Sequence, residues 1–366
     1  MRVKLKDITK FSKGTQINGK NLIDDGAYSY LNGGINPSGK WNEFNVAENT
    51  VTISEGGNSS GYVNYMNKAF WCGAHCYYLY DGPKNSKYLY YALKSQQERL
   101  FRIRSGACMP NIKKSDLGNF VIEYEKDEIR QEEVVKVLEK CELLIEDYNK
   151  KLALLDEAVR ARFVEMFGDE NNSKGWEIVN IEDVVNVQVG VVIKPSQYYT
   201  NQYNGIKAFR SLNIGNGYIK DDDWVYFSKE GNKKNKKSIL STNDVLVVRS
   251  GAPGTACVVT SEYAGSNAID VIIAHPDFQK VDSHYLCTYT NMPHGKSQII
   301  EGTGGAAQQH FNVGKYNKLK LMLPPLEYQK QYVKFLEEID KSRSRIQKSL
   351  EASQELFDSL MQKYFG

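Results

Sequence analysis

The sequence predicts two α+β domains in tandem repeat, each followed by a long helix, with the two helices pairing as an antiparallel coiled coil. Three observations predict this arrangement: an internal repeat, an apolar stripe that closes each copy of the repeat, and short β-like runs between the stripes. At 366 residues the chain is also longer than one ordinary core of about 150 residues, so more than one domain is expected.

An internal repeat divides the chain into two halves. Matched residues keep one spacing near the start of each half, and the spacing increases where loops differ in length. Residues 131–168 then align with residues 329–366 without a gap. Each half is therefore a variable domain followed by a segment of fixed length. Matched pairs are Asp7 with Asp183, Ile8 with Val184, Phe11 with Val187, Gly14 with Gly190, Asn49 with Asn243, Val51 with Val245, Ser86 with Ser283, Tyr88 with Tyr285, Leu89 with Leu286, Leu138 with Leu336, Leu152 with Leu350 and Phe167 with Phe365.

The fixed segment of each half is predicted to be a helix. Its apolar residues alternate between intervals of four and three, which is the repeat of about 3.5 residues that is typical of a coiled coil. Arg162 in the first copy, and Arg343 and Ser353 in the second, interrupt the stripe, and Gly168 and Gly366 stand where a helix C-cap favours glycine. The seam residues are Val134, Leu138, Cys141, Ile145, Tyr148, Leu152, Leu155, Val159 and Met166 in the first helix, and Tyr332, Leu336, Ile339, Ile346, Leu350, Phe357, Leu360 and Tyr364 in the second.

Two interpretations of these stripes are open on periodicity alone. Separate coiled-coil tails that dimerise the protein would show the same spacing. The tandem repeat favours pairing within one chain, because two equal helices related by a pseudo-twofold axis perpendicular to them run antiparallel. The predicted organisation is a first domain at 1–128, a first helix at 129–168, a polar linker at 169–175, a second domain at 176–326 and a second helix at 327–366.

Composition indicates a folded chain without a membrane or export segment. Hydrophobic residues make up 41% and charged residues 25%, which are ordinary globular values, and no apolar run reaches the roughly 20 residues that cross a bilayer. We therefore expect a cytoplasmic protein with reduced cysteines. Cys72 and Cys76 flank His75, but no second ligand pair at zinc spacing follows, so no metal site is expected.

Fragments of catalytic motifs occur without the context that catalysis needs. Gly57, Ser59 and Gly61 match G-x-S-x-G, but a nucleophile elbow requires a helix next, and the following residues alternate like a strand. The glycine-rich segments at 251–255 and 302–305 lack the lysine of a phosphate-binding loop. The sequence therefore predicts no catalytic centre in this chain.

Clustered basic residues indicate a nucleic-acid-binding surface, although the net charge is only +3. Cationic side chains near a duplex displace counterions from phosphates, whereas Gln and Asn can pair with adenine and Arg with guanine. A solvated charge run is the alternative for each cluster, and an internal hydrogen bond is the alternative for each polar residue. The candidate DNA-binding residues are Arg99, Arg102, Arg104, Asn111, Lys113 and Lys114 in the first domain, and Arg210, Lys233, Lys234, Lys236, Lys237, Arg249, Gln308, Gln309, His310 and Asn312 in the second.

The exit from the second domain carries the most specific pattern in the chain. Its segments are NDVLVVRSGAPG at 243–254 and GTGGAAQQHFNVGKYNKLKLMLPPLEYQKQYVKFLEEID at 302–340. A glycine-rich loop, an Asn-aliphatic step at Asn312, an apolar strand, a proline pair and Gln329 follow one another. With this order and its two variable domains and two helices, the whole chain resembles the specificity subunits of type I restriction-modification systems. In the first half, Asn111 is expected to match Asn312, whereas the proline pair is replaced.

The resemblance implies a function and partners. In that family each variable, or target-recognition, domain reads one half of a bipartite double-stranded DNA target, and the helices set the unread gap. Two copies of a DNA adenine methyltransferase subunit bind the specificity subunit, and restriction subunits with ATP-driven translocase and nuclease activities join them. AdoMet, ATP and magnesium would belong to these partners, and no cofactor is expected in this chain.

The resemblance leaves two rival functions to weigh. A stand-alone methyltransferase or restriction enzyme is disfavoured, because its AdoMet-binding and catalytic motifs are missing from the sequence. A coiled-coil scaffold protein without DNA binding is the remaining alternative. Because the loops and basic clusters of the two domains differ, a DNA target would be asymmetric.

Overall fold

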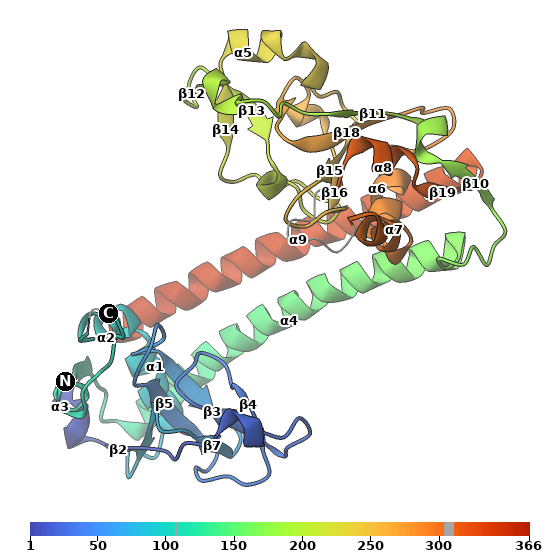
Figure 1. Ribbon diagram of the computed structural model, residues 1–366. Helices are drawn as coiled ribbons and strands as arrows, with labels where there is room; N and C mark the ends of the chain where they lie inside the picture. Colours follow the sequence, from blue (N-terminus) through green and yellow to red (C-terminus); the bar gives the residue numbers. More distant parts are fainter. Residues whose placement is uncertain (107, 304–310) are drawn as a thin grey trace. The chain divides into compact units, whose positions relative to one another are not determined.

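The computed structural model describes residues 1–106, 108–303 and 311–366, and these residues form two compact units. Unit 1 comprises Met1–Lys151 together with Ile346–Gly366, and unit 2 comprises Leu152–Arg345. Each unit contains one α+β domain and a part of each of two long helices (Figure 1). The predicted fold class is therefore confirmed. No helix in the described part of the chain is both long and apolar enough to cross a membrane.

The described residues of the domain of unit 1 form three sheets, three short α-helices and two 3-10 helices. Its elements are β1 (Arg2–Lys4), η1 (Leu5–Asp7), β2 (Lys10–Lys13), η2 (Gly19–Asn21), β3 (Tyr28–Leu31), β4 (Gly39–Trp41), β5 (Thr50–Ser54), β6 (Val63–Met66), β7 (Phe70–Cys72), β8 (Cys76–Tyr80), α1 (Ser86–Lys94), α2 (Gln97–Arg102), α3 (Lys114–Gly118) and β9 (Val121–Glu123). The main sheet has the order β2-β8-β5-β6 and is antiparallel. A second sheet has the order β4-β3-β7, and β1 pairs with β9.

The domain of unit 2 repeats this plan with longer connections. Its elements are β10 (Glu177–Asn180), η3 (Ile181–Asp183), β11 (Val185–Val189), η4 (Pro195–Tyr198), β12 (Tyr199–Thr200), β13 (Ile206–Phe209), η5 (Ser211–Asn213), β14 (Val225–Phe227), α5 (Lys229–Lys234), η6 (Lys236–Ser238), β15 (Val245–Val248), β16 (Ala256–Val258), η7 (Ser261–Tyr263), β17 (Asn267–Ala268), β18 (Val271–Pro276), α6 (Ser283–Asn291), α7 (Pro293–Thr303), α8 (Val313–Asn317) and β19 (Lys320–Leu323). The main sheet has the order β11-β18-β15-β16, the second sheet β12-β14-β13-β17, and β10 pairs with β19.

The repeat in the sequence corresponds to a repeat in the sheets. Matched glycines follow β2 and β11 because the chain there lies directly against another strand. A Cβ atom on Gly14 would lie 1.8 Å from the carbonyl oxygen of Cys72, and a Cβ atom on Gly190 would lie 2.4 Å from that of Ala268. Any side chain at these positions would clash with the backbone, so glycine is required at the same place in both domains.

The two long helices begin and end close to the predicted residues. Helix α4 spans Glu128–Phe167 and helix α9 spans Leu326–Phe365, each one residue earlier than the predicted 129–168 and 327–366. Asp127 supplies the start signal of α4, because its carboxylate accepts the backbone N–H of Ile129 at 3.0 Å. Gly168 follows α4 at a φ of +88°, the left-handed conformation of a helix C-cap.

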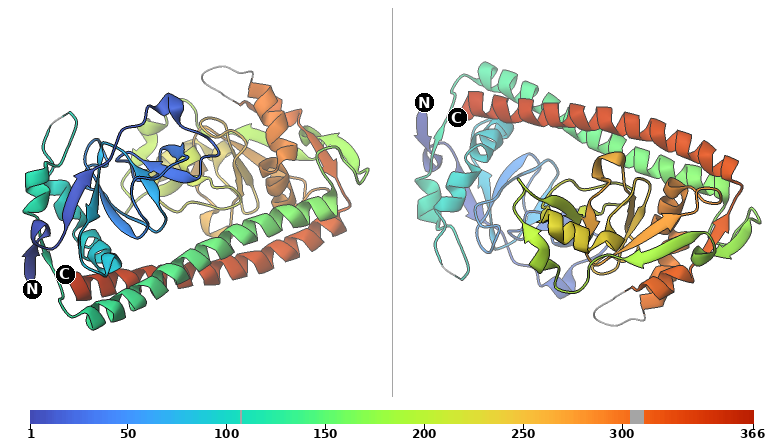
Figure 2. Two further views of the ribbon diagram at one scale, coloured as in Figure 1. Left: turned by 90° about the horizontal axis from the view of Figure 1, so that it is seen from below. Right: turned by 90° about the horizontal axis from the view of Figure 1, so that it is seen from above.

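Within each unit, the parts of α4 and α9 that belong to it lie side by side and run in opposite directions (Figure 2). In unit 1, Leu138 of α4 packs in one core with Met361 and Phe365 of α9. In unit 2, Phe163 and Phe167 of α4 pack with Tyr332 of α9, at ring-centroid distances of 5.5 and 5.4 Å. The predicted antiparallel pairing within one chain is therefore present in both units.

The seam positions lie on the covered side of the two helices. The polar interruptions have partners of their own: Arg343 Nη2 lies 2.6 Å from Asp156 Oδ1, and the Ser353 hydroxyl donates to the carbonyl of Ser349. The Arg162 guanidinium lies over the ring of Phe335. Fully buried seam residues are Val134, Leu138, Cys141, Tyr332 and Ile339, and half-buried ones are Ile145, Tyr148, Leu152, Leu155, Val159, Met166, Leu336, Ile346, Leu350, Phe357, Leu360 and Tyr364.

Candidate nucleic-acid interface

Four candidate lysines of unit 2 lie together on α5 and η6, in a stretch at 229–238 that we call the lysine segment. Lys233, Lys234, Lys236 and Lys237 are all exposed. Ser228 starts the segment, because its hydroxyl accepts the backbone N–H of Gly231 at 3.0 Å. Exposed ammonium groups on consecutive helical turns form the kind of surface that attracts phosphate.

Polar side chains between the lysines face the domain and fix the segment from below. Asn232 and Ser238 are buried, and both bond the buried Asn267 of β17, each at 2.8 Å. Asn235, midway between them, bonds the carbonyl of Gly231 at 2.8 Å. The amide of Gln188 on β11 donates to the carbonyl of Lys237 at 2.5 Å. The sequence NKKNKKS at 232–238 contains this period of three, so the signal for an anchored helical segment was present in the sequence.

The three candidate arginines of unit 1 differ in how far their side chains are exposed to solvent. Arg99 and Arg102 are exposed on α2, and Arg99 lies over the ring of Phe120. Arg104 is half-buried, and its guanidinium donates to the carbonyls of Phe101 at 2.6 Å and Asn58 at 3.3 Å. Because these bonds occupy Arg104 within the domain, Arg99 and Arg102 are the two of the three whose charges face solvent.

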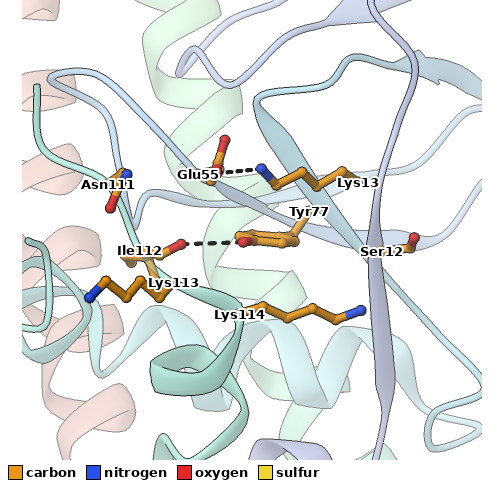
Figure 3. Close-up of a pocket in the computed structure, with 8 residues that line it drawn as sticks. All are labelled: Ser12, Lys13, Glu55, Tyr77, Asn111, Ile112, Lys113 and Lys114. Atoms are coloured by element: carbon orange, nitrogen blue, oxygen red, sulfur yellow. Dashed lines mark hydrogen bonds and ion pairs between the residues drawn. The ribbon is translucent and has the colours of Figure 1, made fainter.

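Lys113 and Lys114 border a cleft of about 490 Å³ in unit 1 (Figure 3). Both side chains are exposed, and their ammonium groups point away from each other below the Tyr77 ring. On the other side of that ring, Lys13 and Glu55 form an ion pair. Asn111 lines the same cleft, and its side-chain oxygen accepts the Ser105 hydroxyl at 3.1 Å. The cleft therefore combines three lysines with one carboxylate, and sequence reasoning did not identify Lys13 or Glu55.

Arg249 lies inside the domain of unit 2. Its side chain is 10% exposed, its Nη1 lies 2.7 Å from Asp270 Oδ1, and its Nε donates to the carbonyl of Phe311 at 3.1 Å. Arg210 is also engaged, because its guanidinium bonds the carbonyl and carboxylate of Asp223. Both guanidinium groups therefore bond groups of their own domain, in contrast to the exposed lysines, although the buried Nε of Arg210 has no hydrogen-bond partner among the described residues.

Of the four candidate residues at 308–312, the structure describes Asn312 alone. The Asn312 side chain caps α8 by accepting the backbone N–H of Lys315 at 2.9 Å. Gln308, Gln309 and His310 lie outside the described residues.

The predicted match between Asn111 and Asn312 is wrong. Glu55 and Arg249 directly follow the matched strands β5 and β15, and their carbonyls accept the backbone N–H groups of Ile112 and Phe311, at 2.9 and 3.0 Å. Ile112 and Phe311 are both fully buried, so these two residues are the structural equivalents. Asn312 therefore matches Lys113, because burial of the aliphatic or aromatic residue fixes the register more strongly than the identity of the asparagine.

The cysteine pair of unit 1 lies in the core of its domain. Cys72 and Cys76 are buried, and a hydrogen bond with Cys76 together with burial raises the pKa of Cys72 well above its usual range. A metal ligand or nucleophile requires the thiolate, which these surroundings disfavour. Among the described residues, no group of three or more His, Cys, Asp or Glu side chains could hold a metal ion.

Comparison with known proteins places this arrangement in a family. The family model described as the type I restriction modification DNA specificity domain matches residues 1–156 and 173–354. The chain belongs to this family. The two matched ranges correspond to the two copies of the internal repeat, so each half of the chain contains one specificity domain.

Individual relatives agree with this specificity-domain family. A putative type I specificity subunit from Mycoplasma pneumoniae is 38% identical over 149 residues, a match that spans 40% of this chain and 40% of that protein. The crystal structure of a type I restriction-modification S subunit from M. genitalium covers 100% of this chain and 96% of its own, at 20% identity and a TM-score of 0.66. A type I R-M structure concerned with complex assembly and conformational transition covers 99% of this chain at a TM-score of 0.52 and 14% identity. These structural likenesses show the fold.

Proposed function

We propose that this chain is the sequence-specific DNA-binding specificity subunit of a type I restriction-modification complex. Each domain reads one half of an asymmetric bipartite target in double-stranded DNA, and the paired helices set the unread gap between the halves. The chain performs no catalysis and acts in the cytoplasm.

One observation supports this proposal above the others: two domains of one fold present different exposed basic groups. Unit 1 exposes Arg99 and Arg102 on α2 and lysines beside α3, whereas unit 2 exposes the lysine segment. Phosphate contacts position a protein on DNA, and base contacts from neighbouring loops supply sequence information. Two unlike surfaces on one chain are suited to two unlike half-sites.

The partners follow from the family. Two DNA adenine methyltransferase subunits dock on the specificity subunit, and restriction subunits with translocase and nuclease activities join them. AdoMet, ATP and magnesium are bound by those partners, and the chain described here supplies recognition alone. One chain in a solved structure of a type I R-M system has a fold similar to that of this chain, which supports docking into such a complex.

Methylation mapping tests the proposal. The chain is expressed with its methyltransferase in a host that lacks other adenine methylation, and modified adenines are mapped across the genome. The expected result is one asymmetric bipartite motif with a fixed gap. A scaffold without DNA binding would give methylation that does not depend on this chain, and the purified chain would then show no salt-dependent binding to duplex DNA.

A further inference from the structure

A chain of three polar side chains leads from the core of unit 2 to the lysine segment. Asp244 Oδ1 lies 2.6 Å from His275 Nδ1, and His275 Nε2 lies 2.7 Å from Gln188 Nε2. Gln188 Nε2 then lies 2.5 Å from the carbonyl oxygen of Lys237. Asp244 is 4% exposed, and its second oxygen accepts the backbone N–H of Ser241 at 2.7 Å. We call Asp244, His275 and Gln188 the relay.

The direction of every hydrogen bond in the relay is fixed by its last member. A backbone carbonyl can only accept, so the Gln188 atom beside Lys237 is the amide nitrogen and cannot be the oxygen. The same nitrogen donates its second hydrogen to His275 Nε2, which must therefore be the unprotonated acceptor. His275 Nδ1 then carries the proton and donates it to Asp244. Both hydrogens of the Gln188 amide therefore have a defined acceptor, so Gln188 is held in one orientation.

The relay occurs in the domain that has the lysine segment and is missing from the other. In the matched strands of unit 1, Ser12 stands in place of Gln188 and Tyr80 in place of His275. The lysine segment lies in the connection between β14 and β15. The matching connection in unit 1, at 42–49 between β4 and β5, contains Glu43 and Glu48 and no lysine. Since the sheet itself forms without the relay, the three side chains are not needed to build this fold.

Gln188, at the outer end of the relay, holds the backbone of the lysine segment at one of the lysines. Asn232 fixes the start of the segment, and Ser238 fixes its last residue, from the side of β17. Gln188 reaches the segment from β11 and bonds Lys237 itself. Backbone atoms held from two sides leave only side-chain freedom to Lys236 and Lys237. Less conformational entropy is then lost when both ammonium groups meet phosphates at once.

We propose that Gln188, oriented by His275 and Asp244, is a positioning residue that holds the lysine segment in register with the DNA backbone. This inference rests on the proposed function, because it assumes that the lysines contact phosphate. It assigns to the second domain a contact with the DNA backbone. The first domain does not make this contact through its matched connection at 42–49.

The test measures how binding of the full-length chain to a short duplex of random sequence depends on salt. Gln188→Met keeps the size of the side chain, adds no charge and removes both donors. We expect the slope of log K against log salt to fall in magnitude by about 1, which corresponds to one lost phosphate contact, with an affinity loss of about 3- to 10-fold. Gln279→Met, at an exposed position that follows β18 and belongs to neither the relay nor the lysine segment, is the matched control and is expected to bind as the parent does.

A second comparison separates failure of the inference from failure of the proposed function. Replacing Lys233, Lys234, Lys236 and Lys237 together by Ala should reduce the slope by more than Gln188→Met does, and adding Gln188→Met to that variant should change nothing further. An unchanged slope in the lysine variant would overturn phosphate contact by the segment. A reduced slope in the lysine variant with a parental slope in Gln188→Met would overturn the relay alone, as would an equal effect of Gln188→Met in both backgrounds. If Gln188→Met does not fold, His275→Phe removes the orienting acceptor and is expected to reduce the slope in the same direction.

Discussion

The residues that directly follow β5 and β15 occupy matched places in the two domains and carry opposite charges. Glu55 accepts from Lys13 and lies 3.5 Å from His75 Nδ1, whereas Arg249 donates to Asp270. His75 and Asp270 also occupy matched places. Cys76 pairs with the last residue of β5 and Val271 with the last residue of β15, and His75 and Asp270 directly precede these two residues. The charge at this position has therefore been reversed between the two domains, and the facing residue has changed from His75 to Asp270.

The reversal teaches which part of the scaffold is constant. In both domains the carbonyl of this residue accepts the N–H of a buried residue that leads to the last short helix. The backbone junction is shared, and the side-chain polarity around it is free to change. Two domains with one backbone plan can therefore present surfaces of different charge, which is what an asymmetric target requires.

The largest effect is expected from removing the second domain, because only one of the two compared domains then remains. Residues 1–172 alone lack the part of α9 that covers α4 in unit 1. In the ungapped repeat, Phe163 and Phe167 match Met361 and Phe365, so a second copy of the fragment offers equivalent side chains for the same core. We expect a homodimer with twofold symmetry, driven by burial of the apolar seam.

Sedimentation and methylation mapping check this prediction. Together with the methyltransferase, the dimer should modify an inverted repeat that contains only the first half-site. The full-length chain is the control and should mark the asymmetric site. A fragment that stays monomeric, or a dimer that still marks the asymmetric site, would contradict the pairing argument.

A smaller effect is expected from the matched phenylalanines that end the two long helices. Phe167 is fully buried against Tyr285, at 4.8 Å between ring centroids, and Phe365 is buried against the matched Tyr88, at 5.2 Å. Truncation of either to Ala should cost about 3–5 kcal/mol of unfolding free energy. Because Phe167 also contacts the rings of Phe163 and Tyr332, its loss should be the larger.

Hydrogen exchange can assign each loss to one unit. Phe167→Ala should lower protection in the sheet of unit 2, and Phe365→Ala should lower protection in the sheet of unit 1. Equal loss of protection in both sheets from either variant would show that the two units unfold together.

The smallest effect is expected at the matched position whose charge differs between the two domains, Glu55 in unit 1 and Arg249 in unit 2. Arg249→Met leaves the carbonyl of Phe311 and the carboxylate of Asp270 without this donor, and we expect a cost of about 1–3 kcal/mol, since Asp270 is itself 41% exposed and remains solvated. Glu55→Met removes a carboxylate whose partners are 45% and 61% exposed and stay solvated, and should cost less than about 1 kcal/mol. Exchange rates in β15 and β5 measure the two losses, and a larger loss at Glu55 would reverse the comparison.

The repeated helices were predictable from the sequence, but the direction of each basic side chain was not. An apolar stripe at coiled-coil spacing must be covered, so Leu138 and Tyr332 were identified as seam residues from spacing alone. Whether an arginine faces solvent depends on a partner that is distant in the sequence. The ion pair with Asp270 holds the Arg249 side chain inside the domain, and no residue near Arg249 in the sequence indicates this partner.

Loop registers were the other difficulty. An Asn followed by an aliphatic residue occurs in both exits, and this coincidence suggested the wrong match. The correct match depends on which residue is buried under the β5 or β15 strand end, and this follows from tertiary packing of Ile112 and Phe311.

Unit 1 draws its residues from both ends of the chain, and this has a consequence for the order in which the protein is completed during synthesis. Ribosomes add about 5–20 residues per second, so residues 346–366 follow residue 151 by on the order of 10–40 s. Through that interval the first part of α4 has no α9 to cover Val134 and Leu138, while all the residues of unit 2 are made. The domain that leaves the ribosome first is therefore the last to close its core.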